Sequence, residues 1–107
     1  VLKEVSRVLD VKIIPPACLF GRWGGEEFVI ICPNLHLEQA CKLGEKVRQI
    51  IELHDFVFEK HIMRVTISVG CAELTPGMSE PSFLFKEVDR AMYRAKNGGR
   101  NRVCTNI

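Results

Sequence analysis

The sequence lacks the features that most quickly assign a protein to a class. It has no low-complexity tract, no internal repeat and no segment with the pattern of a signal peptide. Its longest apolar run, Phe28 to Cys32, is far too short to cross a bilayer. A net charge of +2 gives no reason to expect binding to nucleic acid or to a membrane surface. The length of 107 residues and the 47% hydrophobic content are typical of one small globular domain.

The cysteines also lack a recognisable pattern. There are five of them, an odd number, and their spacings match no metal-binding or redox motif: Cys18, Cys32, Cys41, Cys71 and Cys104. Most have apolar neighbours, so we interpret them as small buried side chains in a reducing compartment. This predicts a cytoplasmic location for the domain and leaves open a membrane anchor elsewhere in the parent protein.

The first third of the chain predicts a helix followed by a hairpin. Apolar residues recur at helical spacing from Val1 to Leu9, and Pro15-Pro16 ends any helix there. Two short apolar runs, Ala17 to Phe20 and Phe28 to Cys32, surround a glycine-rich break. Such a pattern indicates two strands joined by a turn.

The rest of the chain alternates between helical and strand patterns. Helical periodicity predicts a helix from about Leu37 to Leu53, and alternation predicts a strand from Val65 to Cys71. A last helix, capped by Ser79 or Ser82, should stop at Gly98-Gly99. A short strand from Arg102 to Thr105 closes the predicted order. The expected fold class is α+β, with an antiparallel-containing central sheet covered by helices.

Gly24-Gly25-Glu26-Glu27 at the hairpin tip has two readings from its residues alone. Glycines let a ligand approach the backbone, whose N–H groups can face phosphate oxygens, and adjacent carboxylates suit Mg²⁺. Two carboxylates about 5 Å apart repel by roughly 3 kcal/mol at an effective dielectric near 20, which a cation would relieve. Alternatively, the tip is simply acidic and solvated.

The end of the last helix is equally ambiguous. Lys96 and Arg100 flank Asn97-Gly98-Gly99, where two cations complement the helix dipole. The same two side chains could instead hold a polyphosphate, Arg through its planar fork and Lys as a point charge.

Three segments of the sequence together resemble one known family, in the order in which that family carries them, and this resemblance favours the functional interpretation of both motifs. Residues 22–31, RWGGEEFVII, resemble the signature of the GGDEF domain family, in the variant with Glu at the third position. Residues 66–70, TISVG, resemble a later strand of that family, and residues 89–101, DRAMYRAKNGGRN, resemble its closing segment. The resemblance implies a palm-like, ferredoxin-like nucleotide-cyclase fold with the signature on a β-hairpin.

The resemblance also implies a diguanylate cyclase of bacterial second-messenger signalling. Such enzymes condense two GTP molecules into cyclic di-GMP, with release of pyrophosphate, across a homodimer that an upstream sensory domain controls. By position, Glu26 and Glu27 would be catalytic and bind Mg²⁺ or Mn²⁺. Gly24, Gly25, Lys96 and Arg100 would bind the substrate phosphates. The alternative is a catalytically inactive member that binds GTP or a protein partner.

Two departures from the family pattern carry expectations of their own. The family's first strand and helix, with a metal-binding aspartate and guanine-reading residues, do not precede Val1. We therefore expect residues 1–107 to be the C-terminal two-thirds of a GGDEF domain, inactive alone. Pro15 and Cys18 stand where many members carry the Arg and Asp of an inhibitory product site, so we expect no such site here.

Overall fold

The computed structural model describes residues 2–12, 14–15, 18–24 and 27–107. The helices in this part of the chain are α1 (Leu2–Lys12), α2 (Leu37–Leu53) and α3 (Pro81–Asn97). The strands are β1 (Leu19–Gly24), β2 (Glu27–Ile31), β3 (Phe56–Phe58), β4 (His61–Met63), β5 (Val69–Cys71) and β6 (Val103–Thr105). This mixture of helices and short strands confirms the α+β class. No helix within the described ranges is long and apolar enough to cross a membrane.

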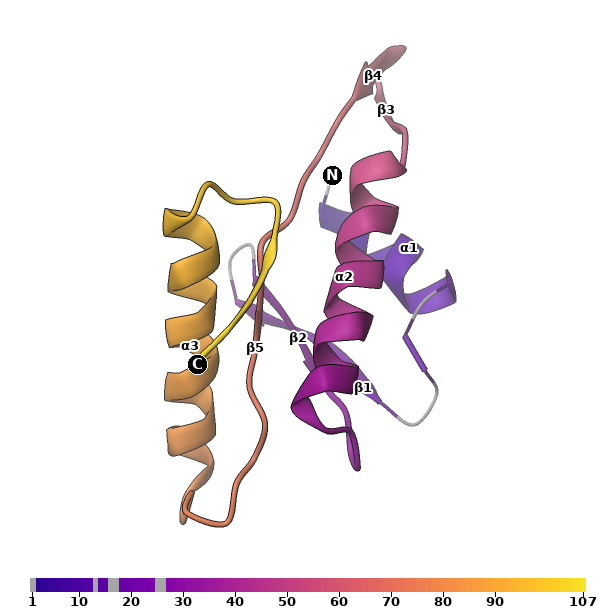
Figure 1. Cartoon of the computed structure of the whole chain (residues 1–107). Helices are drawn as coiled ribbons and strands as arrows, with labels where there is room; N and C mark the ends of the chain where they lie inside the picture. The colour runs from indigo at the N-terminus through magenta and orange to yellow at the C-terminus, as the bar shows by residue number, and fades with distance from the viewer. Residues whose placement is uncertain (1, 13, 16–17, 25–26) are drawn as a thin grey trace.

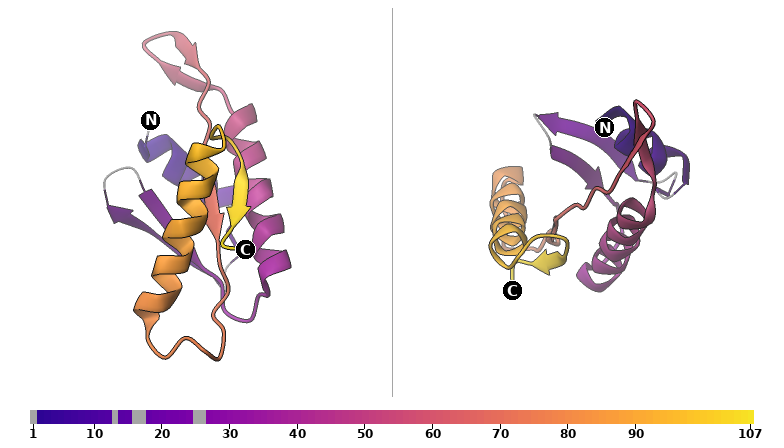
Figure 2. Two further views of the ribbon diagram at one scale, coloured as in Figure 1. Left: turned by 60° about the vertical axis from the view of Figure 1, so that its left-hand side comes forward. Right: turned by 90° about the horizontal axis from the view of Figure 1, so that it is seen from above.

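The strands pair two by two. β1–β2 and β3–β4 are antiparallel hairpins, whereas β5 and β6 are parallel. The β5–β6 pair runs between α2 and α3 and packs against both (Figure 1, Figure 2). The β3–β4 hairpin extends beyond the end of α2 (Figure 1). The closing segment of the chain therefore packs beside α2, although the two are distant in sequence.

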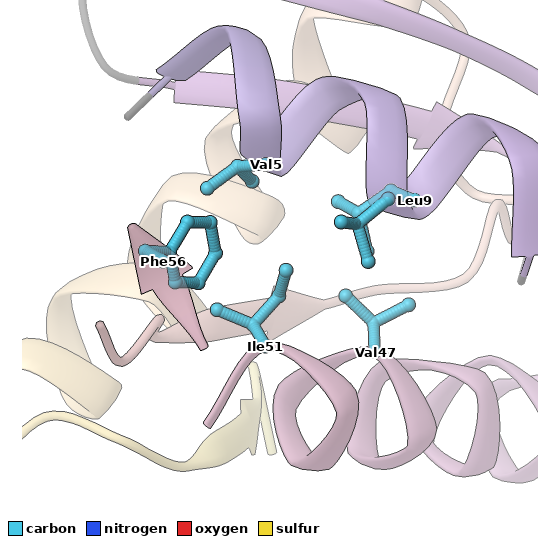
Figure 3. Packing of buried hydrophobic residues seen from close by; sticks show 6 residues of the cluster. Val5, Leu9, Val47, Ile51 and Phe56 are labelled. Carbon is cyan, nitrogen blue, oxygen red and sulfur yellow. The ribbon is translucent and has the colours of Figure 1, made fainter. Parts of the chain in front are cut away.

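The main hydrophobic cluster joins α1 to α2. Val5, Val8 and Leu9 of α1 meet Val47 and Ile51 of α2, and Phe56 of β3 closes one end (Figure 3). All six side chains are buried. The helical spacing of these residues on both helices is the pattern that predicted the two helices, and both predictions are confirmed for the described residues.

The predicted hairpin is present. The Cα partners run from Leu19 with Ile31 to Gly24 with Glu27, and the register shifts between Arg22 and Gly24. The first strand is longer than predicted because the glycines and Arg22 continue its ladder. Such an irregularity bends a strand and redirects its side chains, and here it lies next to the Gly-Gly-Glu-Glu tip.

One predicted strand is shorter than expected, and one hairpin was not predicted. The predicted strand from Val65 to Cys71 is paired only over Val69–Cys71, because β6 supplies three partner residues and no more. The hairpin of β3 and β4 was not predicted. Its turn residues, Glu59 and Lys60, both have positive φ (49° and 71°) without being the Asn or Gly that mark such turns.

The start of α3 also differs from the prediction. Neither Ser79 nor Ser82 caps the helix: the N-cap residue is Glu80, and it makes no side-chain capping bond. Pro81 is the first helical residue, where its fixed φ and missing N–H are compatible with a helix start. The predicted stop is confirmed, since α3 ends at Asn97 with Gly98 as its C-cap.

Candidate functional site

The hairpin tip presents Glu27 at the first position of β2. Gly24 ends β1 directly opposite Glu27. Gly25 and Glu26, which the sequence also predicts to be site residues, lie outside the described residues. The structure therefore defines the two residues that flank the tip, and the roles of Gly25 and Glu26 stay predictions.

Lys96, in the last turn of α3, reaches the same tip. Its Nζ lies 3.9 Å from Oε1 of Glu27. Both side chains are about half exposed, 42% for Lys96 and 49% for Glu27, and pairs as exposed as this contribute at most about 1 kcal/mol to stability. The contact is therefore weak enough to rearrange around a ligand, and it brings together two of the predicted site residues across 69 positions of sequence.

Arg100 lies on a turn with an unusual backbone. Gly99, Arg100 and Asn101 have consecutive positive φ values of 119°, 65° and 45°. The Arg100 N–H donates to the carbonyl of Ala95 at 2.9 Å, which closes the end of α3. Gly99 suits this position because its φ of 119° is one that residues with a side chain rarely adopt.

The Arg100 side chain itself is exposed and has no ion-pair partner among the residues that the structure describes. The structure thus joins Lys96 to Glu27, and it places Arg100 four residues further on, with no ion pair to Glu27. No carboxylate of the described residues therefore competes with an anion for the Arg100 guanidinium.

A polar cluster that the sequence analysis missed fixes this turn. The Arg48 side chain, 14% exposed, pairs with Glu45 and with Glu52 on the same helix. Arg48 Nη1 also donates to Oδ1 of Asn101 at 2.9 Å, and the Asn101 amide donates to Glu52. The bond to Glu45 is the first cause of a lowered pKa at that carboxyl. Only the helical spacing of Arg48 and Glu52 was visible in the sequence.

Removal of the Asn101 side chain should destabilise the domain measurably. Asn101→Gly keeps the positive φ accessible but deletes the bonds to Arg48 and Glu52, so we expect a loss of about 1 kcal/mol of unfolding free energy. Asn101→Ala should lose roughly a further 1 kcal/mol, because alanine disfavours a φ of 45°. Thermal unfolding of the full-length protein checks the order wild type, Asn101→Gly, Asn101→Ala. Equal midpoints for the three proteins would contradict a structural role of the cluster.

The donor chemistry at the tip fits a hard divalent cation only in part. Glu27 supplies carboxylate oxygens, which Mg²⁺ and Mn²⁺ accept. Within the described ranges there is no group of three or more His, Cys, Asp or Glu side chains that could hold a metal. Further oxygen ligands are expected from Glu26, next to Glu27 in sequence, from a bound phosphate, and from the metal-binding aspartate that the family resemblance places before Val1.

The two residues at the predicted inhibitory position lie at the other end of the hairpin from the tip. The Cys18 N–H donates to the Pro15 carbonyl at 2.9 Å, just before β1. Pro15 is exposed and Cys18 half-buried. Neither side chain carries a charge that would recognise a phosphate or a guanine, and the absence of a product site there stays a prediction.

Known proteins resemble this chain in both sequence and fold. The family model described as "Diguanylate cyclase, GGDEF domain" matches residues 1–102. The diguanylate cyclase DgcM of Escherichia coli K12 is 45% identical over 85 residues, which is 79% of this chain and 20% of that protein. The active GGEEF domain of a Vibrio cholerae diguanylate cyclase superposes with a TM-score of 0.82 at 32% identity, over 96% of this chain and 64% of that one.

A third relative is the GGDEF domain of DgcB from Caulobacter crescentus, whose crystal structure contains cyclic di-GMP. It superposes with a TM-score of 0.90 at 28% identity, over 98% of this chain and 62% of that chain. The fold is therefore that of the GGDEF nucleotide cyclases. The chain belongs to the GGDEF diguanylate cyclase domain family. It spans a fifth of the length of the E. coli relative and less than two-thirds of both solved domains.

Proposed function

We propose that this chain carries the phosphate-binding edge of a diguanylate cyclase that joins two GTP molecules into cyclic di-GMP in a bacterial signalling protein. The family membership and the names of the matched relatives support this activity. In the reaction, each GTP 3′-oxygen forms a bond to the α-phosphorus of the other, and the bond from that phosphorus to the β-phosphate oxygen breaks. Two pyrophosphates leave.

The observation that carries the proposal is the contact between Lys96 and Glu27. A cation at the end of α3 lies 3.9 Å from the carboxylate at the start of β2, beside the tip where the two glycines occur. Phosphoryl transfer requires mainly positioning and neutralisation of charge, and a lysine next to a carboxylate can serve phosphate and cation together. This arrangement favours a nucleoside triphosphate over a neutral ligand.

Each site residue then has a proposed role. Gly24 and Gly25 leave room for the phosphates and offer backbone N–H groups, while Lys96 and Arg100 hold the terminal phosphates and the leaving pyrophosphate. Glu26 and Glu27 hold a divalent cation, and Glu26 helps to take the proton of the attacking hydroxyl. When bound, Mg²⁺ or Mn²⁺ neutralises phosphate charge and orients the α-phosphate.

The chemistry needs two GTP sites that face each other, so the proposal includes a homodimer as the working state. The input that controls dimerisation is expected to come from a sensory domain elsewhere in the parent protein. Every activity test below therefore uses the full-length protein.

Loss of the Lys96 charge should weaken use of GTP. In the full-length protein, Lys96→Ala removes one charged hydrogen bond to phosphate, which is worth about 1.5–3 kcal/mol. We therefore expect kcat/KM for GTP to fall roughly 10- to 100-fold. The measurement is the initial rate of cyclic di-GMP formation against GTP concentration. Lys86→Ala is the matched control, because Lys86 lies on the same helix over the ring of Phe83. Equal kcat/KM values for the two variants would contradict the role given to Lys96.

A further inference from the structure

Two thiols stand opposite each other at the open end of the hairpin. The last register pair of β1 and β2 is Leu19 with Ile31, so Cys18 and Cys32 are the residues that directly flank the two strands at this end. Residues directly opposite in an antiparallel pair have Cα atoms about 4.5–5.5 Å apart. A disulfide accepts Cα separations of about 4.4–6.8 Å. Extended by one residue, the register therefore places these two cysteines at a separation compatible with a disulfide.

The two thiol side chains also interact with each other. Cys18 and Cys32 are both half-buried free thiols, and the Cys32 thiol interacts with the Cys18 side chain. Burial first, and then the contact with Cys18, raises the pKa of Cys32 to about 12. Cys32 therefore remains a protonated thiol at neutral pH, which makes it a poor first nucleophile but leaves it next to the sulfur of Cys18.

We propose that Cys18 and Cys32 form an oxidisable dithiol that hydrogen peroxide converts into a cross-strand disulfide. The Cys18 sulfur attacks the peroxide, its S–H proton leaves with the departing oxygen as water, and Cys18 becomes a sulfenic acid. The Cys32 sulfur then attacks the Cys18 sulfur, the S–S bond forms, and the hydroxyl leaves with the Cys32 proton as a second water. One peroxide is reduced and two thiols are oxidised.

The disulfide would enclose the signature of the site. The segment between the two cysteines contains all of β1, the Gly-Gly-Glu-Glu tip and all of β2. A covalent bond at the open end of the hairpin ties the strands together opposite the tip. The inference does not rest on the proposed function, because it uses only the register and the two thiols.

A second thiol pair provides the competing linkage. Cys71 on β5 is buried and contacts Cys41 on α2, and its thiol also approaches the carbonyl of Ala40 at 3.8 Å. Burial, followed by the influence of Cys41, raises the pKa of Cys71 to about 12. Because Cys71 is 8% exposed, peroxide should reach it after Cys18.

The test is peroxide titration of the reduced full-length protein, followed by alkylation of the remaining thiols and mass spectrometry. A protease that cuts after glutamate leaves each of the five cysteines of this chain on its own peptide, so every linkage can be distinguished. We expect loss of alkylation at Cys18 and Cys32 together, at the lowest peroxide concentration, with the two peptides joined. Dithiothreitol should restore both thiols, which separates a disulfide from irreversible oxidation.

Variants sharpen the test. Cys18→Ser and Cys32→Ser should each abolish the link, and Cys104→Ser, which keeps both thiols of the pair, should leave it unchanged. Cross-linked peptides that join Cys32 to Cys71, or Cys41 to Cys71, before Cys18 to Cys32 would overturn the proposal. Alkylation of both Cys18 and Cys32 at peroxide concentrations that oxidise the other cysteines would overturn it too, and this outcome needs no variant to fold.

Discussion

Replacement of Glu26 by glutamine is expected to lower cyclic di-GMP formation by the full-length protein about 10²- to 10³-fold, the range measured when one preorganised charge-stabilising group is removed from an active site. Glutamine keeps the size of the side chain and one oxygen but removes the negative charge. Without that charge, Glu27 alone remains of the adjacent carboxylate pair, and the attacking hydroxyl loses a proton acceptor. GTP binding through Lys96 and Arg100 should persist, so the loss should appear mainly in kcat.

The measurement is product formation at saturating GTP and Mg²⁺, with GTP affinity determined separately by equilibrium binding. Glu38→Gln is the matched control, since Glu38 is an exposed carboxylate in the first turn of α2. Equal rates for wild type and Glu26→Gln would refute the role assigned to Glu26. If wild type itself binds GTP without turnover, the alternative of a non-enzymatic regulatory module is supported instead.

The sequence predicted those elements whose signal is local and long. The helix expected from Leu37 to Leu53 has those bounds in the structure. Apolar periodicity over about five turns fits a helix and no other secondary structure. The β3–β4 hairpin escaped prediction because its turn uses Glu59 and Lys60 in a conformation that normally selects Asn or Gly. The length of β5 depends on a partner strand more than thirty residues later, which no local pattern reveals.

In the candidate site, too, local sequence predicted the residues but not the contacts between them. Lys96 and Arg100 were predicted from their place in a family motif, and so was Glu27. The contact between Lys96 and Glu27 depends on how α3 packs on the β5–β6 pair and beside the hairpin, so it could not be predicted from spacing. The link from Arg48 to Asn101 spans 53 positions and joins α2 to the turn that carries Arg100. Local sequence identifies the reactive groups, whereas tertiary packing determines which of them meet.

At Gly70, α3 approaches β5 more closely than a side chain would allow. A Cβ added at Gly70 would lie 2.4 Å from the backbone nitrogen of Met92 and 2.8 Å from the carbonyl oxygen of Val88. These are main-chain atoms of α3, so no side-chain rotation relieves the overlap. The buried Ala91 and Ala95 on the same helix permit this approach. Gly70→Ala must therefore push the helix away from the strand.

We expect Gly70→Ala to lower the unfolding free energy by roughly 3 kcal/mol or more, at the upper end of overpacking substitutions. For a domain of this size the thermal midpoint should fall by about 10–20 °C. Gly77→Ala is the control, because an added Cβ there meets nothing within 4 Å. Because α3 also carries Lys96, Gly70→Ala should affect activity as well as stability. At a temperature where the variant is still folded, we expect it to use GTP less well than wild type, although Gly70 itself lies on β5. Matching midpoints for the Gly70→Ala and Gly77→Ala proteins would show that α3 tolerates displacement from β5 without loss of stability. Unchanged use of GTP by Gly70→Ala would contradict a role of this packing in positioning Lys96.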